Sequence, residues 1–399
     1  MKQFWKKPDR TIWTANLILL ATATLVLSFG QGMLGGARTN FFIDTLGLTG
    51  EQVLWLEGIR EIPGLALMFI AAAVMHLPLV WQTAAYILIM GVGYALYAPV
   101  DSYGTLIGVA IFASLGMHGW MPLNSALSMS LTTKDKSGQV LGALSSVTAL
   151  ASIVGMGGIA LADKVLPALS LRVYYAVGGT LIVLAAVLVA RLPKHIGSTE
   201  KTQPRMLLSR RYWLYYVLTF LQGSRKQAMG TFTTLVLVDL HGLDVWQISL
   251  LFLVSGIVNF ISAPRLGRLL DRFGERATLT ASYILLTLCC IGYAVVHSIW
   301  ILAILVILIR LLLVCGIGLS TYINRIAPPE ELAPTLSAGV SINHVTSVAT
   351  PLLAGALLPV IGYSGVFWGT AGIILISIPF ALAMRITRVS TGTVAESAM

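Results

Sequence analysis

The amino-acid sequence predicts an all-α membrane protein in which twelve transmembrane helices form two pseudo-symmetric six-helix bundles. Three observations support this prediction: the composition, the number of long apolar runs, and the similarity between the two halves of the chain. Of the 399 residues, 57% are hydrophobic and only 11% are charged, and the mean hydropathy is +0.85. Because soluble domains carry about 25% charged residues, most of this protein's surface must face lipid.

The apolar runs follow one another along the whole chain. A helix needs about 20 apolar residues to cross a bilayer, and twelve runs approach or exceed that length. They are 12–42, 52–75, 79–98, 104–130, 138–162, 172–191, 212–238, 245–264, 277–297, 299–324, 335–359 and 364–386. The first run is longer than a signal-peptide core of about 7–15 residues, and no small-residue cleavage site follows it. We therefore expect it to form the first helix of the protein.

One long polar stretch divides the chain nearly in half. We expect an N-terminal bundle over 1–191, a cytoplasmic linker over 192–211 and a C-terminal bundle over 212–399. The halves also resemble each other in order. The sequence LSFGQG at 27–32 matches LTFLQG at 218–223, and the tripeptide YIL occurs at both 86–88 and 283–285. Matches at a nearly constant offset are typical of an internal repeat.

The positive charges are distributed unevenly between the two sets of loops. Lys and Arg residues precede the first run, fill the linker, cluster at 265–276 and follow the last run, whereas the opposite loops hold only Lys164 and Arg172. Because cytoplasmic loops retain Lys and Arg, we expect both termini and the linker in the cytoplasm and the protein in the inner membrane. The net charge of +10 therefore reflects topology and not a nucleic-acid partner.

Few residues suggest covalent chemistry. The three cysteines, Cys289, Cys290 and Cys315, lie in apolar runs, and their spacing fits neither a zinc site nor a disulfide framework. The sequence motifs of hydrolases, metalloproteases and phosphate-binding loops are missing as well. We expect no enzymatic activity, no catalytic residue, no cofactor and no metal.

The segment GRLLDRFGER at 267–276 resembles the G-x-x-x-D-R-x-G-R-R loop of the major facilitator superfamily. Together with six plus six helices and a basic central linker, it makes the chain similar to that superfamily over nearly its whole length. The stretch GIREIPG at 58–64 is similar to a prokaryotic branch of it. The resemblance implies a secondary transporter that works by alternating access. The gate residues that it implies are Gly267, Asp271, Arg272, Gly274 and Arg276. The alternative is that this segment is only a basic loop that sets the topology.

Polar residues inside the apolar runs are the candidate substrate ligands. A charge in the bilayer core costs about 2.5–3.5 kcal/mol, so each such residue calls for a role. In the superfamily, the first, fourth, seventh and tenth helices line a central cavity where the repeats meet. The candidates in those helices and in the eleventh are Gln31, Arg38, His118, Asn124, Gln222, Arg225, Arg310, Asn343 and His344.

These candidates are cationic and rich in amides, with no carboxylate at the predicted midplane. Guanidinium groups grip carboxylate or phosphate with two parallel hydrogen bonds, so we expect an organic anion or a phosphorylated or carboxylated metabolite, anchored by Arg225 and Arg310. Structural pairing with neighbouring helices is the alternative for both arginines. A multidrug or sugar-like transporter and a non-transporting sensor or scaffold remain alternative functions. The GMGG stretch at 155–158 lacks the Gly-Pro pattern of the superfamily's antiporters, which argues against drug/proton antiport.

Two acids lie in the second run. Glu57, Arg60 and Glu61 occupy positions i, i+3 and i+4, so Arg60 can pair with Glu57 on one helix face. Mutual neutralisation is the favoured interpretation, and the alternative makes Glu57 or Glu61 a proton-coupling carboxylate. His118 and His344 are further proton candidates because imidazole titrates near neutrality. The expected partners are a small-molecule substrate, the lipid bilayer and a co-transported proton, for a protein that acts as a monomer.

Overall fold

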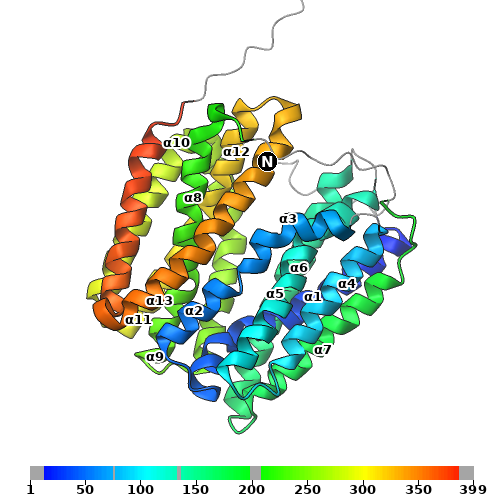
Figure 1. The fold of residues 1–399 in the computed structure, drawn as a ribbon, viewed down its shortest axis with the longest axis horizontal. Coiled ribbons are helices and arrows are strands. Elements are labelled where there is room, and N and C mark those ends of the chain that lie inside the picture. The colour runs from blue at the N-terminus through cyan, green and yellow to red at the C-terminus, as the bar shows by residue number, and fades with distance from the viewer. Residues whose placement is uncertain (1–12, 75–76, 133–135, 198–207, 386–399) are drawn as a thin grey trace, which may run out of the picture.

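The computed structural model describes residues 13–74, 77–132, 136–197 and 208–385. The termini and the middle of the linker, both predicted to be cytoplasmic, lie outside these residues. Within the described residues, helices cross the molecule twelve times between its two ends, and we refer to each crossing as a pass (Figure 1). Six passes come from each half of the chain.

The N-terminal half consists of α1 (Ala15–Asn40), α2 (Gly50–Ile59) followed by α3 (Ile62–Val74), α4 (Leu79–Leu96), α5 (Tyr103–Ser130), α6 (Ser137–Val165) and α7 (Leu171–Ala190). The C-terminal half consists of α8 (Trp213–Gln227), α9 (Thr233–Asp239), α10 (Val245–Val295), α11 (Ile299–Leu313), α12 (Ile317–Ile326) and α13 (Pro329–Leu382). Short π- or 3-10 segments join α8 to α9 and α11 to α12, so each of these pairs forms one pass.

Two long helices each contain two passes. The chain reverses within α10 at Gly274, where φ is 80°, and within α13 at Gly362, where φ is 64°. Glycine adopts positive φ without the steric penalty of a Cβ atom. Each glycine therefore makes a sharp turn between consecutive passes.

Among the described residues, nine segments are long and apolar enough to span a membrane. One of them, Ala338–Leu382, contains two passes. The α2–α3 and α8–α9 passes are not among the nine. The first is divided into two short helices, and the second carries Arg225 and Lys226 near its middle. The predicted fold class is confirmed. The predicted run 52–75 is divided into α2 and α3, whereas the predicted run 212–238 forms one pass with a π-helical segment, Ala228–Phe232, near its middle.

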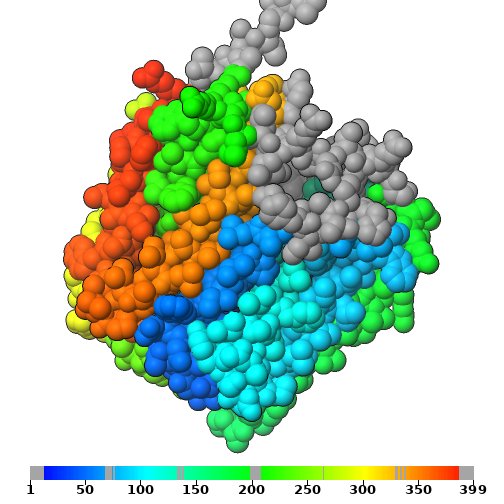
Figure 2. All heavy atoms as spheres, viewed as in Figure 1, coloured from blue at the N-terminus to red at the C-terminus, as the bar shows by residue number. Residues whose placement is uncertain are grey.

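The two bundles are joined at one end. We call the end that holds residues 191–197 the linker end, at the top of Figure 1, and the opposite end the closed end. Near the closed end, the amide of Asn40 donates to the carbonyl of Leu243 at 2.7 Å, and the hydroxyls of Thr39 and Thr234 lie 3.4 Å apart. Figure 2 shows the surface of α13 directly against that of α2 across the visible face. The bundles thus share a contact surface that includes polar groups.

The repeated sequence motif has the same packing role in both halves. A Cβ atom at Gly32 of α1 would lie 2.4 Å from the carbonyl oxygen of Ser152 on α6. A Cβ atom at Gly223 of α8 would lie 2.3 Å from the carbonyl oxygen of Asn343 on α13. Small residues at such positions let helix backbones approach closely in membranes. The internal repeat is therefore visible as two equivalent backbone contacts.

Replacing Gly32 with alanine should destabilise the fold, because the new methyl group meets a backbone oxygen that cannot move without shifting α6. Overpacking of this kind typically costs about 1–3 kcal/mol. The matched control is Gly108→Ala on α5, where a Cβ atom meets nothing within 4 Å, and which should be neutral or stabilising by up to about 1 kcal/mol. Thermal unfolding of the two variants in detergent, compared with the wild type, tests this difference. Equal melting temperatures for both variants would contradict it.

Candidate functional site

A break in the second pass places charged groups between the bundles. Pro63 has no backbone N–H and cannot continue the α-helical hydrogen-bond pattern, and α2 ends just before it. The N–H of Gly64 donates to the carbonyl of Glu61 and leaves the carbonyl of Arg60 available. That carbonyl accepts a hydrogen bond from the hydroxyl of Ser114 on α5. A neighbouring helix thus satisfies the freed backbone group, as interrupted helices in membranes require.

Glu57 is the centre of a buried charge network. Its side chain is 1% exposed, and its two carboxylate oxygens lie 2.9 Å from Nε of Arg60 and 3.5 Å from Nη1 of Arg38. Thr231, in the π-helix Ala228–Phe232 of the C-terminal half, donates to the same carboxylate at 3.4 Å. The predicted pairing of Glu57 with Arg60 is confirmed. A second arginine and a hydroxyl from the opposite bundle extend it.

Glu61 lies between two histidines from other helices. Nε2 of His118 on α5 and Nδ1 of His344 on α13 are each 3.4 Å from its Oε2, and Nη2 of Arg60 is 3.7 Å from its Oε1. Gly64 leaves room for both rings, because a Cβ atom there would lie 2.7 Å from His344 and 2.9 Å from His118. Three side chains that the sequence offered separately therefore form one cluster between the bundles.

A pocket of about 300 Å³ lies between the bundles and is lined by both halves. Three predicted substrate ligands line it: Gln31, Arg38 and Arg310. Three aromatic rings and two methionines supply most of the apolar lining, namely Tyr94, Tyr175, Phe252, Met117 and Met156. Gln31 and Arg38 share one face of α1, whereas Arg310 comes from α11 in the other bundle. The pocket therefore combines cations from both repeats with an aromatic wall.

Arg310 and Arg38 differ in how their charge is balanced. The guanidinium carbon of Arg310 lies 3.7 Å from the centre of the Phe252 ring, which is a favourable cation–π arrangement. Among the described residues, no carboxylate forms an ion pair with Arg310, whereas Arg38 pairs with Glu57. An aromatic ring compensates a buried positive charge only in part. Arg310 is therefore the pocket cation that an anionic ligand would complement.

The structure places Arg225 away from this pocket. Its side chain is 2% exposed, and Nη2 donates to the hydroxyl of Tyr283 at 2.9 Å while Nη1 donates to Ser377 at 3.2 Å. The guanidinium group also lies 4.0 Å from the centre of the Tyr283 ring. These contacts hold α8 to α10 and α13 inside the C-terminal bundle. The structural-pairing alternative thus describes Arg225, and the pocket cations are Arg310 and Arg38.

The predicted amide ligands also lie outside the pocket, Gln31 excepted. The side-chain amide of Asn343 donates to the carbonyl of Thr219 at 3.4 Å, which joins α13 to α8. The amide nitrogen of Gln222 would lie 2.4 Å from a Cβ atom at Gly316, so it fills the space beside that glycine. Asn124 is half-buried on α5. Their depth in the membrane was predicted from the sequence, but their rotation about each helix axis was not.

In the loop motif, the charged residues that the resemblance singled out are exposed. Asp271, Arg272 and Arg276 all point to the surface. Gly274 supplies the turn that reverses α10, which explains the glycine at this position. A Cβ atom at Gly267 would meet nothing within 4 Å among the described residues, so the close packing implied for that glycine is not found here.

The ion pair at this loop joins a buried acid, which the motif does not mark, to an exposed arginine. Glu275 is 0% exposed, and its carboxylate lies 2.7 Å from Nε of Arg325 at the end of α12. The pair joins the turn of α10 to the neighbouring pass within the same bundle. The sequence signal for it was weak, because an acid next to the motif's glycine looks like one more charge in a solvated loop.

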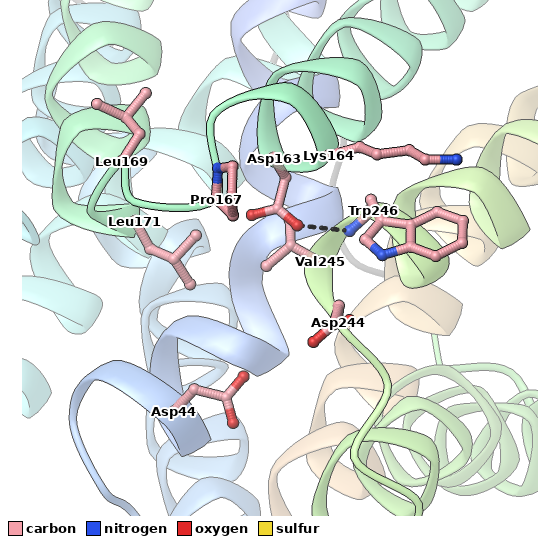
Figure 3. Close-up of a pocket in the computed structure, with 9 residues that line it drawn as sticks. All are labelled: Asp44, Asp163, Lys164, Pro167, Leu169, Leu171, Asp244, Val245 and Trp246. Atoms are coloured by element: carbon pink, nitrogen blue, oxygen red, sulfur yellow. Dashed lines mark hydrogen bonds between the residues drawn. The ribbon is translucent and has the colours of Figure 1, made fainter.

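A second pocket, of about 310 Å³, lies at the closed end (Figure 3). Asp44, Asp163 and Asp244 line it from three different segments, together with Lys164 and Trp246. Asp163 on α6 accepts a hydrogen bond at 3.1 Å from the backbone N–H of Trp246, in the first turn of α10. A carboxylate is favourable at a helix N-terminus, where backbone N–H groups are unpaired. This contact therefore latches the N-terminal bundle to the C-terminal one.

Comparisons with known proteins agree with this architecture. The family model described as Major Facilitator Superfamily matches residues 20–323. Two relatives named Multidrug resistance protein MdtG are 24% identical over 98% of both chains in Serratia proteamaculans (strain 568) and 25% identical over 93% of both in Salmonella typhimurium. The solved structure of the nucleoside transporter NupG matches with a TM-score of 0.75 at 13% identity, over 93% of this chain and 99% of that one. At this identity, the structural likeness concerns the fold alone.

Removing the carboxylate of Asp163 should loosen the closed end. Spin labels on exposed positions of the two bundles, Ala168→Cys and Leu240→Cys, report the separation of the bundles there through electron–electron distance measurements. We expect Asp163→Ala to lengthen and broaden the distance distribution, and Asp163→Asn, which keeps an acceptor oxygen, to change it less. Loss of a helix-capping acceptor typically costs about 0.5–2 kcal/mol.

The control for this experiment is Asp101→Ala, which removes an exposed carboxylate from another closed-end loop of the same bundle. That variant should leave the distances unchanged. A distribution for Asp163→Ala that is identical to the wild type would show that the contact does not hold the bundles together.

Proposed function

The chain belongs to the major facilitator superfamily, and from this premise we propose that it carries an amphipathic organic anion across the inner membrane by alternating access. It is a transporter and not an enzyme. The two bundles rock about the central pocket and expose it to one side of the membrane at a time. The pocket cations Arg310 and Arg38 bind the anionic group of the substrate.

The observation that carries this proposal is the position of Arg310. Its guanidinium group lines the pocket against the ring of Phe252, without an acidic partner among the described residues. A buried charge is costly unless it is paired, so a ligand that brings a carboxylate or phosphate relieves an unfavourable state of the empty protein. The planar guanidinium fork also matches the geometry of these groups.

The rest of the lining favours an apolar or aromatic body on the substrate. Tyr94, Tyr175 and Phe252 present ring surfaces, and Met117 and Met156 present flexible thioethers. Ligand pockets of about 300–1,000 Å³ are typical for small molecules and cofactors, and this pocket lies at the lower limit of that range. A small aromatic or branched acid fits this volume and chemistry better than a strongly hydrated sugar does.

Arg38 connects the pocket to the charge network. It lines the pocket and also contacts Glu57 at 3.5 Å, with its side chain 30% exposed. A bound anion therefore competes with Glu57 for the same guanidinium group. Substrate binding at Arg38 therefore affects the interface between the bundles, because Glu57 also accepts a hydrogen bond from Thr231 of the C-terminal half.

Multidrug transport is the second candidate function. The relatives from Serratia and Salmonella carry the name Multidrug resistance protein, and flexible methionines suit a pocket that adapts to several apolar ligands. On this reading, the aromatic wall and the methionines dominate recognition and Arg310 is secondary. The charge preference of the pocket separates the two candidates.

The orientation that we propose follows from the basic residues. Lys and Arg are concentrated in the segments at the linker end and in both terminal segments, so the positive-inside rule places that end in the cytoplasm. The closed end, with Asp44, Asp163 and Asp244, then faces away from the cytoplasm. The structure corresponds in this orientation to a state in which the bundles are latched on the outer side.

Thermal-shift screening of the purified protein tests the anion proposal. Amphipathic carboxylates or phosphate esters should raise the melting temperature, because a ligand that binds only the folded state stabilises it by mass action. Arg310→Ala should weaken this binding by about 10- to 100-fold, since a hydrogen bond to a charged group contributes about 1.5–3 kcal/mol. Sugars should have no effect on either protein.

Arg268→Ala is the matched control, because Arg268 is an exposed arginine on α10 outside the pocket. It should bind the anion as tightly as the wild type does. Stabilisation by lipophilic cations with no response to anions would replace the anion proposal with the multidrug candidate. Equal anion affinity in the wild type and in Arg310→Ala would remove Arg310 as the anchor.

A further inference from the structure

The cluster of Glu61, His118 and His344 offers a mixed set of metal ligands. One carboxylate oxygen and two imidazole nitrogens lie within 4.8 Å of one another. Glu61 and His118 belong to the N-terminal bundle and His344 to α13 of the C-terminal bundle. Imidazole with carboxylate is a typical ligand set for Zn²⁺ and related transition-metal ions. The residues are far apart in the sequence, so no spacing motif predicted the cluster.

Hydrogen bonds fix which nitrogen of His118 carries a proton. Nδ1 lies 2.9 Å from the backbone carbonyl of Ser114 and 3.0 Å from its hydroxyl. The carbonyl can only accept, and the hydroxyl already donates its single proton to the carbonyl of Arg60. Nδ1 is therefore the donor, and Nε2 of the neutral ring directs a lone pair towards Glu61. Metal-binding histidines are oriented by this kind of outer hydrogen bond.

The two distances from the imidazole nitrogens to Glu61 fit a metal ion better than direct hydrogen bonds. Nε2 of His118 and Nδ1 of His344 are each 3.4 Å from Oε2 of Glu61, beyond the usual N–H···O range of about 2.7–3.2 Å. Nδ1 of His344 is buried and has no hydrogen-bond partner among the described residues. In a tetrahedral site with bonds of about 2.0–2.1 Å, neighbouring ligand atoms are separated by about 3.4 Å.

We propose that Glu61, His118 and His344 bind a divalent transition-metal ion of the zinc class, which bridges the two bundles. Three protein ligands leave a fourth position for water. Because His344 reaches the other two ligands only while α13 lies against the second pass, the site is complete only in this arrangement of the bundles. The bound ion therefore locks the described conformation and inhibits transport.

Arg60 is compatible with the bound ion. Its Nη2 approaches Oε1 of Glu61 at 3.7 Å, whereas both histidines face Oε2. Its Nε is held by Glu57 at 2.9 Å. The guanidinium charge is thus shared between two carboxylates, and one oxygen of Glu61 remains directed at the imidazoles.

Metal binding can be measured on the full-length, tag-free protein after treatment with a chelator. Zn²⁺ should raise the melting temperature by several degrees, and Mg²⁺ and Ca²⁺, which prefer all-oxygen sites, should not. Co²⁺ should produce the intense visible absorption of a four-coordinate ion, and Zn²⁺ should abolish it. This measurement needs no substrate, so a failure to bind metal leaves the anion proposal intact. A failure to bind anions likewise leaves the metal proposal intact.

Variants locate the site. His344→Ala, His118→Ala and Glu61→Gln should each weaken Zn²⁺ binding by at least about 10- to 100-fold, the loss expected even for removal of an outer hydrogen-bond partner. Gly64→Ala keeps all three ligands but crowds both rings, and it should also weaken binding. His297→Ala, which removes an exposed histidine outside the cluster, is the control and should bind Zn²⁺ normally.

Two results would overturn the proposal. One is a wild-type protein that shows neither Zn²⁺ stabilisation nor a Co²⁺ spectrum, a result that does not depend on whether any variant folds. The absence of both metal signals would overturn the proposal even if acidification stabilised the protein, because the cluster would then hold a proton and not a metal ion. The other is Zn²⁺ binding that His344→Ala and His118→Ala leave unchanged, which would place the ion elsewhere.

Discussion

A carboxylate that is 1% exposed in a membrane-embedded protein needs positive partners, and Glu57 has two. Removing one partner of a buried ion pair typically costs about 3–5 kcal/mol, so this pairing constrains the centre of the molecule. It holds Arg60 at the helix break and positions Arg38 at the edge of the pocket. Through Thr231 it also reaches the opposite bundle. The pocket and the bundle interface therefore depend on the same buried charge.

Arg225 and Arg310 of the C-terminal half differ in how their positive charges are compensated. Arg225 has hydroxyl partners and an aromatic ring on its own bundle, and these contacts suit a permanent structural role. Arg310 has the ring of Phe252 and an open pocket. A transporter requires a binding group whose charge is compensated by the bound substrate. Of Arg225 and Arg310, only Arg310 has that property.

The fold was predictable because it depends on quantities that the sequence displays directly. The length of each apolar run gives the passes, and the basic segments and repeated LSFGQG-type motif give the division into halves. The site was less predictable. Counting along a helix gave the depth of Arg225 and Arg310 alike, but the face on which each lies depends on the packing of neighbouring helices. Glu61, His118 and His344 come from three distant segments, so only the tertiary structure brings them together.

The break in the second pass shows the same limit at the level of secondary structure. Pro63 could have marked the break between α2 and α3, but its consequence, a carbonyl of Arg60 available to Ser114, required knowledge of which helix lies beside it. Proline in a membrane helix is tolerated where a neighbour satisfies the freed group. Sequence periodicity describes each pass alone, whereas the charged centre is a property of several passes together.

The paired contacts of Gly32 with Ser152 and of Gly223 with Asn343 bear on the history of the molecule. In both, a Cβ atom would meet a backbone oxygen, so the close approach of the helices depends on the absence of a side chain at the glycine. After a duplication, such contacts would let each copy diversify its inward-facing side chains while its scaffold stayed the same. The second pass of the first copy now carries Glu57 and Glu61, whereas the corresponding pass of the second copy has no acid between Val245 and Leu270. The symmetry of the scaffold thus accommodates an asymmetric distribution of charge.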